Sequence, residues 1–327
     1  FGASQTSSTR CGRGPGGGGA TFLPTVSPHD NSNVITVCDM TGAYITYDAG
    51  EHWREFNLKT RVDAVAFDPV DGNTVYAGSS GLFRSTDKGR TWRLVFPDPA
   101  RVTGEELMRD EAGHLYRSDD NWPGGEVHGI AIDPADPAIL HICVLRRYGD
   151  GALAVYSSMD GGLSWAESAP LAGKKLHKLA IDTSSPAGQR RLIAFTDEAI
   201  TLVQPGCGEA ERIGLPQGVD VVVNGGCSMD PASGSLVIFL LAPSSWEGRR
   251  FHSGIYRSAD FGQRWEELAG GLDDDLHGPD NGQCRRFRNI GVTGSDCRTV
   301  WVDVWRDPFE FFQNPQPEMN YLGIMKS

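Results

Sequence analysis

The sequence predicts an all-β protein whose short strands form repeated four-stranded antiparallel sheets, the blades of a β-propeller. Two observations support this fold class. The pattern Ser/Thr-x-Asp-x-Gly-x-x-Trp occurs four times, beginning at Thr46, Ser85, Ser158 and Ser258. Short apolar segments precede each copy at even spacing, with turn-forming residues between them. The repeat outweighs the length of 327 residues, which alone would suggest two ordinary domains.

Each repeat reads as four strands in order. The first strand ends near an Asp-Pro pair or a related pair, in the segments Val62–Pro69, Val127–Pro134 and Leu176–Thr183. A second apolar strand follows, in the segments Thr74–Gly78, Ile139–Arg147 and Arg191–Thr196. A third strand leads into the repeated pattern and a fourth begins at its Trp. We therefore expect blades at residues 20–58, 59–122, 123–172, 173–215 and 216–272, with another beginning near Arg288.

The four copies resemble the Asp-box, or BNR repeat, of sialidase-like β-propellers. Asp accepts hydrogen bonds from nearby backbone N–H groups in tight turns, and Gly adopts a positive φ at low steric cost. The Trp buries a large apolar surface at the start of the next strand. Because a catalytic residue has no reason to recur in every blade, we interpret the box carboxylates as turn formers; these are Asp48, Asp87, Asp160 and Asp260. The fourth blade has lost its box.

The two ends of the chain differ from the repeats. The glycine run Gly12–Gly19 lacks the flanking strand and helix and the Lys of a phosphate-binding loop, so residues 1–19 are expected to be an approach segment. Residues 20–327 are then the propeller. The segment Leu322–Ser327 matches Ser253–Ser258, a strand that enters a box. We expect about six blades with the last incomplete, a seven-bladed propeller when complete, and a further segment or second propeller in the same protein.

Composition narrows the partners. The formal net charge is −12, with 30 Lys and Arg against 42 Asp and Glu, which disfavours nucleic acid and acidic membranes as partners. No apolar run is long enough to cross a bilayer. The first residue is Phe1, so earlier removal of a signal peptide is plausible and a secreted protein, extracellular or periplasmic, is expected.

Cysteine usage points to no metal site. No Cys-x-x-Cys pair accompanies a histidine, so we expect neither a metal nor a cofactor. Cys38 and Cys143 lie in apolar strand-like runs and are expected to be buried thiols. The spacing also leaves open two disulfides, Cys207 with Cys227 or Cys284 with Cys297.

Position in the repeat indicates which face of the propeller carries chemistry. The starts of first strands and the loops from second to third strands share one face, and the boxes lie on the other. Aligned on the Asp-Pro pairs, three first strands carry an ionisable residue five positions earlier; these are Asp63, His128 and His177. They form either a solvated channel or a site with groups that titrate near neutrality. Asp39 ends the second strand of the first blade on the same face.

The segment Gly16–Tyr44 resembles the N-terminal opening of family 74 glycoside hydrolases, the xyloglucanase type. That opening has a Gly run, a strand with a Pro-x-Asp turn, the motif Thr-Asp-x-Gly-Gly-Ala-Tyr and then an Asp-box. The resemblance implies two propellers that face each other across a cleft, with a catalytic Asp from each, and Asp39 matches the first. This chain departs from the motif, because Cys38 replaces Thr and Met40-Thr41-Gly42 replaces x-Gly-Gly.

Loops on the same face gather cationic and aromatic residues. Arg binds carboxylate or sulfate in a bidentate manner, and Trp offers a flat surface on which a sugar ring can stack. We therefore expect a polysaccharide or oligosaccharide partner at these candidate residues: Trp122, Arg146, Arg147, Tyr148, Trp246, Arg249, Arg250, Trp305 and Arg306. A cationic face suits a uronate or sulfated glycan better than a neutral one.

Three functions remain open. The first is a secreted hydrolase that cleaves a polysaccharide with two carboxylates, one acting as acid and one as base, and Asp39 is the expected base. The acid is expected in a further segment of the protein or among Asp63 and its neighbours. The second is a lyase on a uronate-containing glycan, in which His128, His177 or Tyr148 abstracts a proton while Arg147 neutralises the carboxylate. The third is a non-catalytic propeller that binds a glycan or serves in assembly, because the fold alone does not choose a function.

Overall fold

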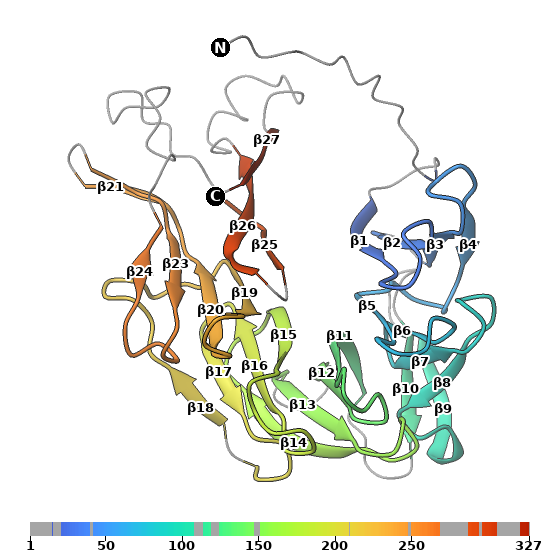
Figure 1. Cartoon of the computed structure of the whole chain (residues 1–327). Coiled ribbons are helices and arrows are strands. Elements are labelled where there is room, and N and C mark those ends of the chain that lie inside the picture. The colour runs from blue at the N-terminus through green and yellow to red at the C-terminus, as the bar shows by residue number, and fades with distance from the viewer. Residues whose placement is uncertain are drawn as a thin grey trace. The chain divides into compact units, whose positions relative to one another are not determined.

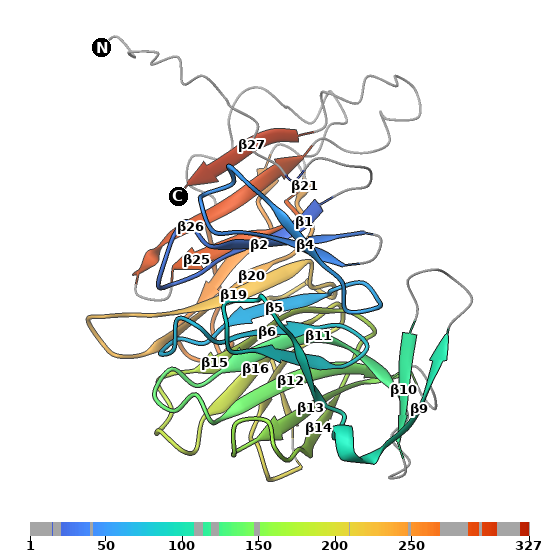
Figure 2. The ribbon, with the colours of Figure 1, turned by 90° about the vertical axis from the view of Figure 1, so that its right-hand side faces the viewer.

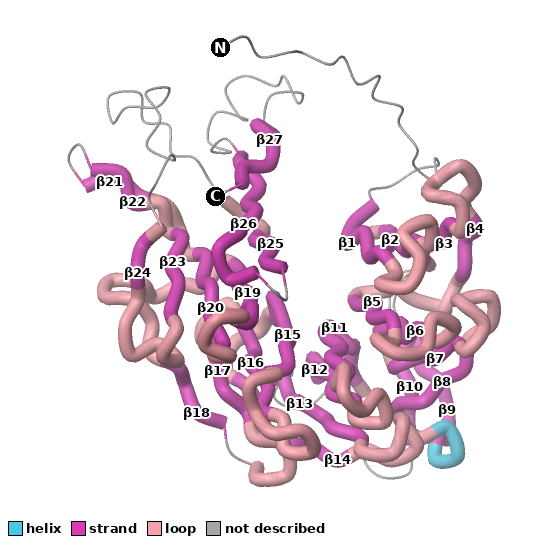
Figure 3. Tube along the Cα trace, in the orientation of Figure 1, coloured by secondary structure: helices cyan, strands magenta, loops and turns pink. Residues whose placement is uncertain are grey.

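The computed structural model describes residues 15, 21–39, 42–107, 114–118, 124–146, 151–208, 210–247, 250–268, 287–293, 296–305 and 321–326. The chain divides into two compact units, Phe1–Asp120 and Asn121–Ser327, which we describe one at a time. Apart from one short 3-10 turn, η1 (Pro99–Arg101), the described residues form strands, turns and loops (Figure 3). Within these residues we find no helix with the length and apolar character needed to cross a membrane.

Unit 1 contains two four-stranded antiparallel sheets that follow one another along the chain (Figure 1). The strands of the first sheet are β1 (Thr21–Val26), β2 (Val34–Cys38), β3 (Ala43–Thr46) and β4 (Arg54–Phe56). Those of the second are β5 (Ala64–Phe67), β6 (Val75–Gly78), β7 (Leu82–Ser85) and β8 (Arg93–Phe96). A buried apolar core, which includes Ile35, Ile45, Val75 and Ala77, lies between them.

A hairpin that the repeat pattern does not predict follows the second sheet. It consists of β9 (Val102–Leu107) and β10 (His114–Ser118), which pair antiparallel (Figure 2). Its Tyr116 is buried in the same core as the two sheets and lies 6.3 Å from Phe83 between ring centroids. Burial raises the pKa of Tyr116 to about 12. This hairpin is therefore packed onto unit 1 through an aromatic anchor.

Unit 2 continues the same arrangement. Its first two sheets are β11 (Gly125–Ile132), β12 (Leu140–Arg146), β13 (Leu153–Ser158) and β14 (Ala166–Leu171), then β15 (Leu176–Asp182), β16 (Arg191–Thr196), β17 (Ile200–Val203) and β18 (Ala210–Ile213). The next comprises β19 (Asn224–Met229), β20 (Leu236–Leu241), β23 (Ile255–Ser258) and β24 (Glu266–Glu267). A three-stranded sheet of β25 (Ile290–Thr293), β26 (Asp296–Trp305) and β27 (Tyr321–Lys326) follows.

The sheets of unit 2 pack as successive blades. The first strand of each sheet contacts the first strand of the next, in the order β11, β15, β19 and β25 (Figure 1). Separate apolar cores lie between neighbouring sheets, so the two middle sheets of unit 2 each bury both faces against their neighbours. In the four-stranded sheets, the order follows the chain from the first strand to the fourth. These features confirm the predicted β-propeller class with four-stranded blades.

The Asp-box turns join third to fourth strands. In each box two consecutive residues have positive φ: Ala49 and Gly50, Lys88 and Gly89, Gly161 and Gly162, and Phe261 and Gly262. Two left-handed residues in succession give the turn a twist that matches the twist of the flanking strands. At Gly89, where φ is +83°, a Cβ would also lie 2.9 Å from Cδ1 of Ile45, so a larger residue would be strained and would displace the Ile45 side chain. The residue before each glycine shares this conformation, which the sequence pattern did not predict.

The box tryptophans hold neighbouring blades together. Trp92 of the second sheet stacks on Phe56 of the first, with ring centroids 4.8 Å apart and planes at 24°. Trp265 packs against the core of the preceding sheet, and its Nε1 donates a hydrogen bond to the carbonyl oxygen of Gly214 at 2.7 Å. In both interfaces, the Trp of one blade contacts the fourth strand or its end in the preceding blade.

The cysteines agree with the expectation in part. Cys38 and Cys143 are buried free thiols, as expected, and burial raises the pKa of Cys143. The suggested disulfide between Cys207 and Cys227 is wrong, because both are free. Cys207 is exposed in the β17–β18 turn, whereas Cys227 packs within a core between sheets. Cys297 is also free, and Cys284 lies outside the described residues.

Candidate functional site

Asp39 immediately follows β2 and is exposed. The preceding Cys38 is buried, and its Sγ donates a hydrogen bond to Oδ1 of Asp39 at 3.5 Å. Beyond Asp39, Gly42 has a φ of +84°, and a Cβ there would lie 2.7 Å from the carbonyl oxygen of Phe56. The buried strand and this constrained turn fix the backbone on both sides of the carboxylate, while Met40 and Thr41 lie outside the described residues.

Asp63 precedes β5 in the second sheet of unit 1. Its backbone N–H donates to the carbonyl oxygen of Gly78 at 2.8 Å, which anchors it beside β6. Its carboxylate forms an ion pair with Arg61, with 2.7 Å between Nε and Oδ1, and only 12% of the Asp63 side chain is exposed. A cation this close favours the charged carboxylate. Asp63 is therefore suited to the role of a base or of an electrostatic contact more than to that of a proton donor.

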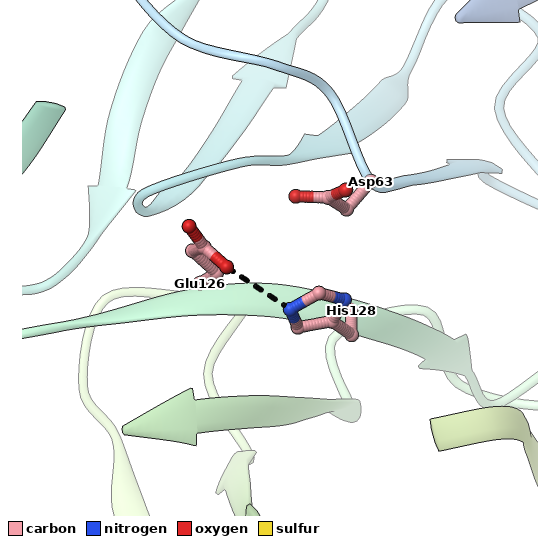
Figure 4. A group of neighbouring side chains, drawn as sticks. All are labelled: Asp63, Glu126 and His128. Atoms are coloured by element: carbon pink, nitrogen blue, oxygen red, sulfur yellow. Dashed lines mark hydrogen bonds and ion pairs between the residues drawn. The ribbon is translucent and has the colours of Figure 1, made fainter. Parts of the chain in front are cut away.

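In unit 2, His128 lies at a β-bulge near the start of β11. Val127 pairs with Val144 and Gly129 pairs with Cys143, so His128 is the additional residue on its strand. Bulges are frequent next to active sites because they re-aim a side chain. Nε2 of His128 is 3.3 Å from Oε2 of Glu126, and the two side chains are turned toward each other (Figure 4). Asp63, drawn in the same figure, belongs to unit 1 and is described with Arg61 above.

His177 occupies the equivalent bulge in the next sheet. Leu176 pairs with Thr196 and Lys178 pairs with Phe195, which leaves His177 as the additional residue on β15. Burial and, to a smaller extent, the charge of Lys175 lower the pKa of His177, while Asp197 opposes the shift. The imidazole is therefore neutral near pH 7. Two successive blades thus use one backbone irregularity to place a histidine.

The four box carboxylates have a different environment from Asp39. In each, Oδ1 accepts hydrogen bonds from the hydroxyl of the box Ser or Thr and from the backbone N–H four residues later; the latter donors are His52, Thr91, Ser164 and Arg264. Hydrogen bonds lower the pKa of Asp48 and Asp160 to about 2, with the backbone of His52 and the hydroxyl of Ser164 as the largest causes. These carboxylates close turns.

The end of the second strand also carries structural carboxylates, which sequence reasoning missed. Oδ1 of Asp197, the residue after β16, accepts the backbone N–H groups of Lys174 and Lys175 at 2.9 and 3.0 Å. Asp303 in β26 accepts those of Arg288 and Asn289 at 2.9 and 2.7 Å. Both carboxylates fix the chain that enters a first strand. Asp39 has the same register position, and the residues it would face, 16–20, are outside the described part.

The predicted substrate-binding loops are only partly described. Arg146 ends β12, its side chain is 18% exposed, and it pairs with Glu167 of β14 and lies 3.3 Å from the hydroxyl of Tyr156. Arg146 is thus anchored across its own sheet. Trp246 and Arg250 lie in a hairpin of β21 (Ser245–Glu247) and β22 (Arg250–His252), between β20 and β23. Trp305 is the last residue of β26; Trp122, Arg147, Tyr148, Arg249 and Arg306 lie outside the described residues.

Glu126 is a further residue that the sequence analysis did not select. It lies two positions before His128 on the same strand. Because strand side chains alternate between faces, residues two apart project to one side, and this period could have identified the pair. The bulge at His128 could not have been found in this way, because it depends on the pairing with β12.

No family model matches the sequence. Among curated proteins, the xyloglucanase Xgh74A of Acetivibrio thermocellus is 26% identical over 174 residues, which is 46% of this chain and 18% of that protein. The match therefore spans less than a fifth of the relative's length.

Two solved structures show the same fold. An ancestral GH74 enzyme superposes with a TM-score of 0.61 at 18% identity, over 96% of this chain and 39% of that chain. The structure of YCF48 bound to a D1 peptide superposes with a TM-score of 0.51 at 15% identity, over 88% of this chain and 76% of that chain. The chain is thus similar both to glycoside hydrolase propellers and to a peptide-bound propeller.

Proposed function

We propose that this chain forms part of a secreted glycoside hydrolase that cleaves a polysaccharide by carboxylate acid–base catalysis. The observation that carries the proposal is the position of Asp39, an exposed carboxylate after a buried strand, in the motif that matches family 74 glycoside hydrolases. Sequence similarity to a xyloglucanase supports the same class of reaction. We do not assign this role to the box carboxylates, because their oxygens accept hydrogen bonds from the backbone of their own turns.

In the proposed mechanism, Asp39 acts as the base. An inverting hydrolase needs one carboxylate that activates water and one carboxylic acid that protonates the leaving oxygen, about 6.5–9.5 Å apart. An exposed carboxylate on a backbone held by Cys38 and Gly42 meets the first requirement. Asp63, which is ion-paired with Arg61, suits the acid role poorly, so we assign the acid to a carboxyl group beyond those two. A two-propeller arrangement like that implied by the family resemblance would supply it.

The substrate class follows from charge. The protein is acidic overall, and the residues proposed to contact glycan include five arginines with three tryptophans and a tyrosine. We therefore propose a glycan that carries carboxylate or sulfate groups. Of these five arginines, Arg146 is held across its own sheet by Glu167 and Tyr156, so we assign the direct contacts with the glycan to the other four.

A second candidate is a non-catalytic propeller that binds a peptide or glycan. The superposition on YCF48 bound to a D1 peptide favours it. That superposition covers 76% of the YCF48 chain, whereas the superposition on the ancestral GH74 enzyme covers 39% of the enzyme chain. The departures from the hydrolase motif at Cys38 and Thr41, which replace Thr and Gly, point the same way.

A panel of neutral, uronate-containing and sulfated polysaccharides distinguishes these functions. We expect new reducing ends without new ultraviolet absorbance, because hydrolysis adds water across the glycosidic bond. Absorbance from an unsaturated uronate would contradict hydrolysis and indicate a lyase, for which the neutral His177 is a suitable base. Binding with no product from any polysaccharide would favour the non-catalytic propeller.

A further inference from the structure

The interface between the β11–β14 sheet and the β15–β18 sheet contains a cavity of ≈ 240 Å³. It is lined by residues of both sheets, among them Ile139, His141, Met159, Arg190 and Pro205. The β15–β18 sheet, which forms one side of this interface, is the blade that has lost its box. The cavity is on the box side of the blades, away from the bulges that carry His128 and His177.

Strand register identifies what the lost box removes. In the blades that have a box, the third and fourth strands pair up to the residue before the box Ser and the residue after the box Trp, so the box Ser and Trp are the next pair in register. In the β15–β18 sheet, Val203 pairs with Ala210 at this position. By this register, Ala210 occupies the place of the box Trp, and it is exposed. The Trp that would pack on the preceding blade is replaced by a methyl group.

At the two interfaces filled by Trp92 and Trp265, the preceding blade presents three apolar residues to the indole. They are the residue before the box Ser or Thr position, its partner on the second strand, and the residue three positions after the Trp position. For Trp92 these are Ile45, Ile35 and Phe56, and for Trp265 they are Leu202, Ile193 and Ile213. At these two interfaces the indole packs on an aliphatic or aromatic surface.

At the interface without a Trp, the three equivalent residues are polar. They are Ser157, His141 and Ser168, and all three are buried. Nδ1 of His141 lies 2.7 Å from Oγ of Ser157, which lies 2.6 Å from Oγ of Ser168. Nε2 of His141 is buried and has no hydrogen-bond partner among the described residues, although the histidine is only 1% exposed. A buried polar atom without a partner costs free energy, which a ligand can recover.

We propose that this cavity binds one planar aromatic ring that carries a hydrogen-bond donor, such as an indole or a phenol, with the donor directed at Nε2 of His141. The ring takes the place that a box Trp fills in other blades. A cavity of about 150 Å³ already accommodates benzene, so ≈ 240 Å³ suffices for a bicyclic ring. Ile139, Met159 and Pro205 supply apolar contacts, and the exposed Gly188 and Gly206 border the entrance.

The charge state and the tautomer of His141 together determine the polarity of the proposed ligand. Burial lowers its pKa to about 4, against a smaller opposing effect of Asp133, so the imidazole is neutral at pH 7. When Nδ1–H donates to Ser157, Nε2 is an acceptor. Ser168, Ser157 and His141 form a series of hydrogen bonds that ends at Nε2. A ligand that extends this series must donate a hydrogen bond to Nε2, as an indole N–H or a phenol O–H can.

The test is a titration of the protein with indole, followed by calorimetry and ligand-observed NMR. We expect saturable binding with one indole per chain. His141→Leu removes the acceptor while retaining an apolar side chain, and is expected to raise the dissociation constant about three- to tenfold. Ala210→Trp is expected to fill the cavity with the protein's own indole, to abolish binding and to raise the melting temperature.

Glu211→Trp is the matched control, because adjacent residues of a strand point to opposite faces. It adds a Trp next to Ala210 and is expected to leave indole binding unchanged. A wild type that binds no indole up to its solubility limit, or an Ala210→Trp protein that binds it as well as wild type, would overturn the proposal. Binding of N-acetyl-tryptophanamide as well as indole would identify a protein side chain as a possible occupant, and binding of indole alone would identify a free small molecule.

Discussion

Individual carboxylates have different roles in this propeller according to what surrounds their oxygens. The box carboxylates accept hydrogen bonds from their own turn, whereas Asp182 is fully buried and pairs with Arg191 at 2.6 Å. Asp197 fixes the chain that enters a first strand. Asp39 shares the register position of Asp197 but is exposed and follows a cysteine. Residue type therefore identifies none of these roles; the acceptor geometry does.

Buried His141 makes stability depend on pH. Its folded pKa is about 4 and its ordinary value is 6.5, so the unfolded chain binds a proton between these values and the folded chain does not. Unfolding is then favoured as pH falls from 7 toward 4. We expect the free energy of unfolding to drop by about 2 kcal/mol between pH 7 and pH 5 through this group. Urea unfolding of wild type and His141→Leu at both pH values measures it, and an equal drop in both proteins would refute it.

At the level of elements, the box turn is a stability device. Asp87 accepts the N–H groups of Arg90 and Thr91 at 3.0 and 2.8 Å and the hydroxyls of Ser85 and Thr91 at 2.7 and 2.6 Å. These bonds hold its pKa well below the usual range, with the Thr91 hydroxyl as the largest cause. A lowered carboxyl pKa stabilises the fold above the unfolded pKa, and that stability is lost as pH falls through the lower folded pKa.

Asp87→Ala is therefore expected to lower the free energy of unfolding by about 1–2 kcal/mol at pH 7 through the lost turn bonds. Catalytic activity per folded molecule is expected to stay at the wild-type level, because the box lies on the face away from Asp39. Thermal unfolding and an activity assay on one preparation measure both quantities. A stable but inactive Asp87→Ala protein would show that the proposed site is on the wrong face.

Strands and box turns were predictable from the sequence because both depend on local patterns. The Asp, Gly and Trp of each box have fixed spacing, and apolar runs of strand length lie between them. The bulges at His128 and His177 were not predictable, since a bulge is a property of pairing between two strands. The anchoring of Arg146 by Glu167 likewise depends on the separation of strands β12 and β14 across a sheet. Sequence position thus located these residues but not their contacts.

At the scale of the whole molecule, each interface between neighbouring blades is a separate unit of packing. At two interfaces, the indoles of Trp92 and Trp265 pack against apolar residues of the preceding blade. At the interface that contains His141, hydrogen-bonded polar side chains and a cavity take the place of the indole. A propeller can therefore change one interface and leave the others intact. The proposed catalytic function likewise uses one strand end of a repeated structure, that of Asp39, and leaves the repeat as scaffold.

The most direct test of the hydrolase proposal is the turnover of Asp39→Asn, measured with its melting temperature and glycan affinity on the same preparation. The change retains size and most hydrogen bonding but removes the titratable carboxylate. We expect turnover to fall by about 10²–10⁴ with the other two quantities nearly unchanged. Asp197→Ala is the control at the same register position, because it removes the oxygen that accepts the backbone N–H groups of Lys174 and Lys175, and we expect it to lower the melting temperature. Full activity of Asp39→Asn, or its unfolding, would contradict the proposed function.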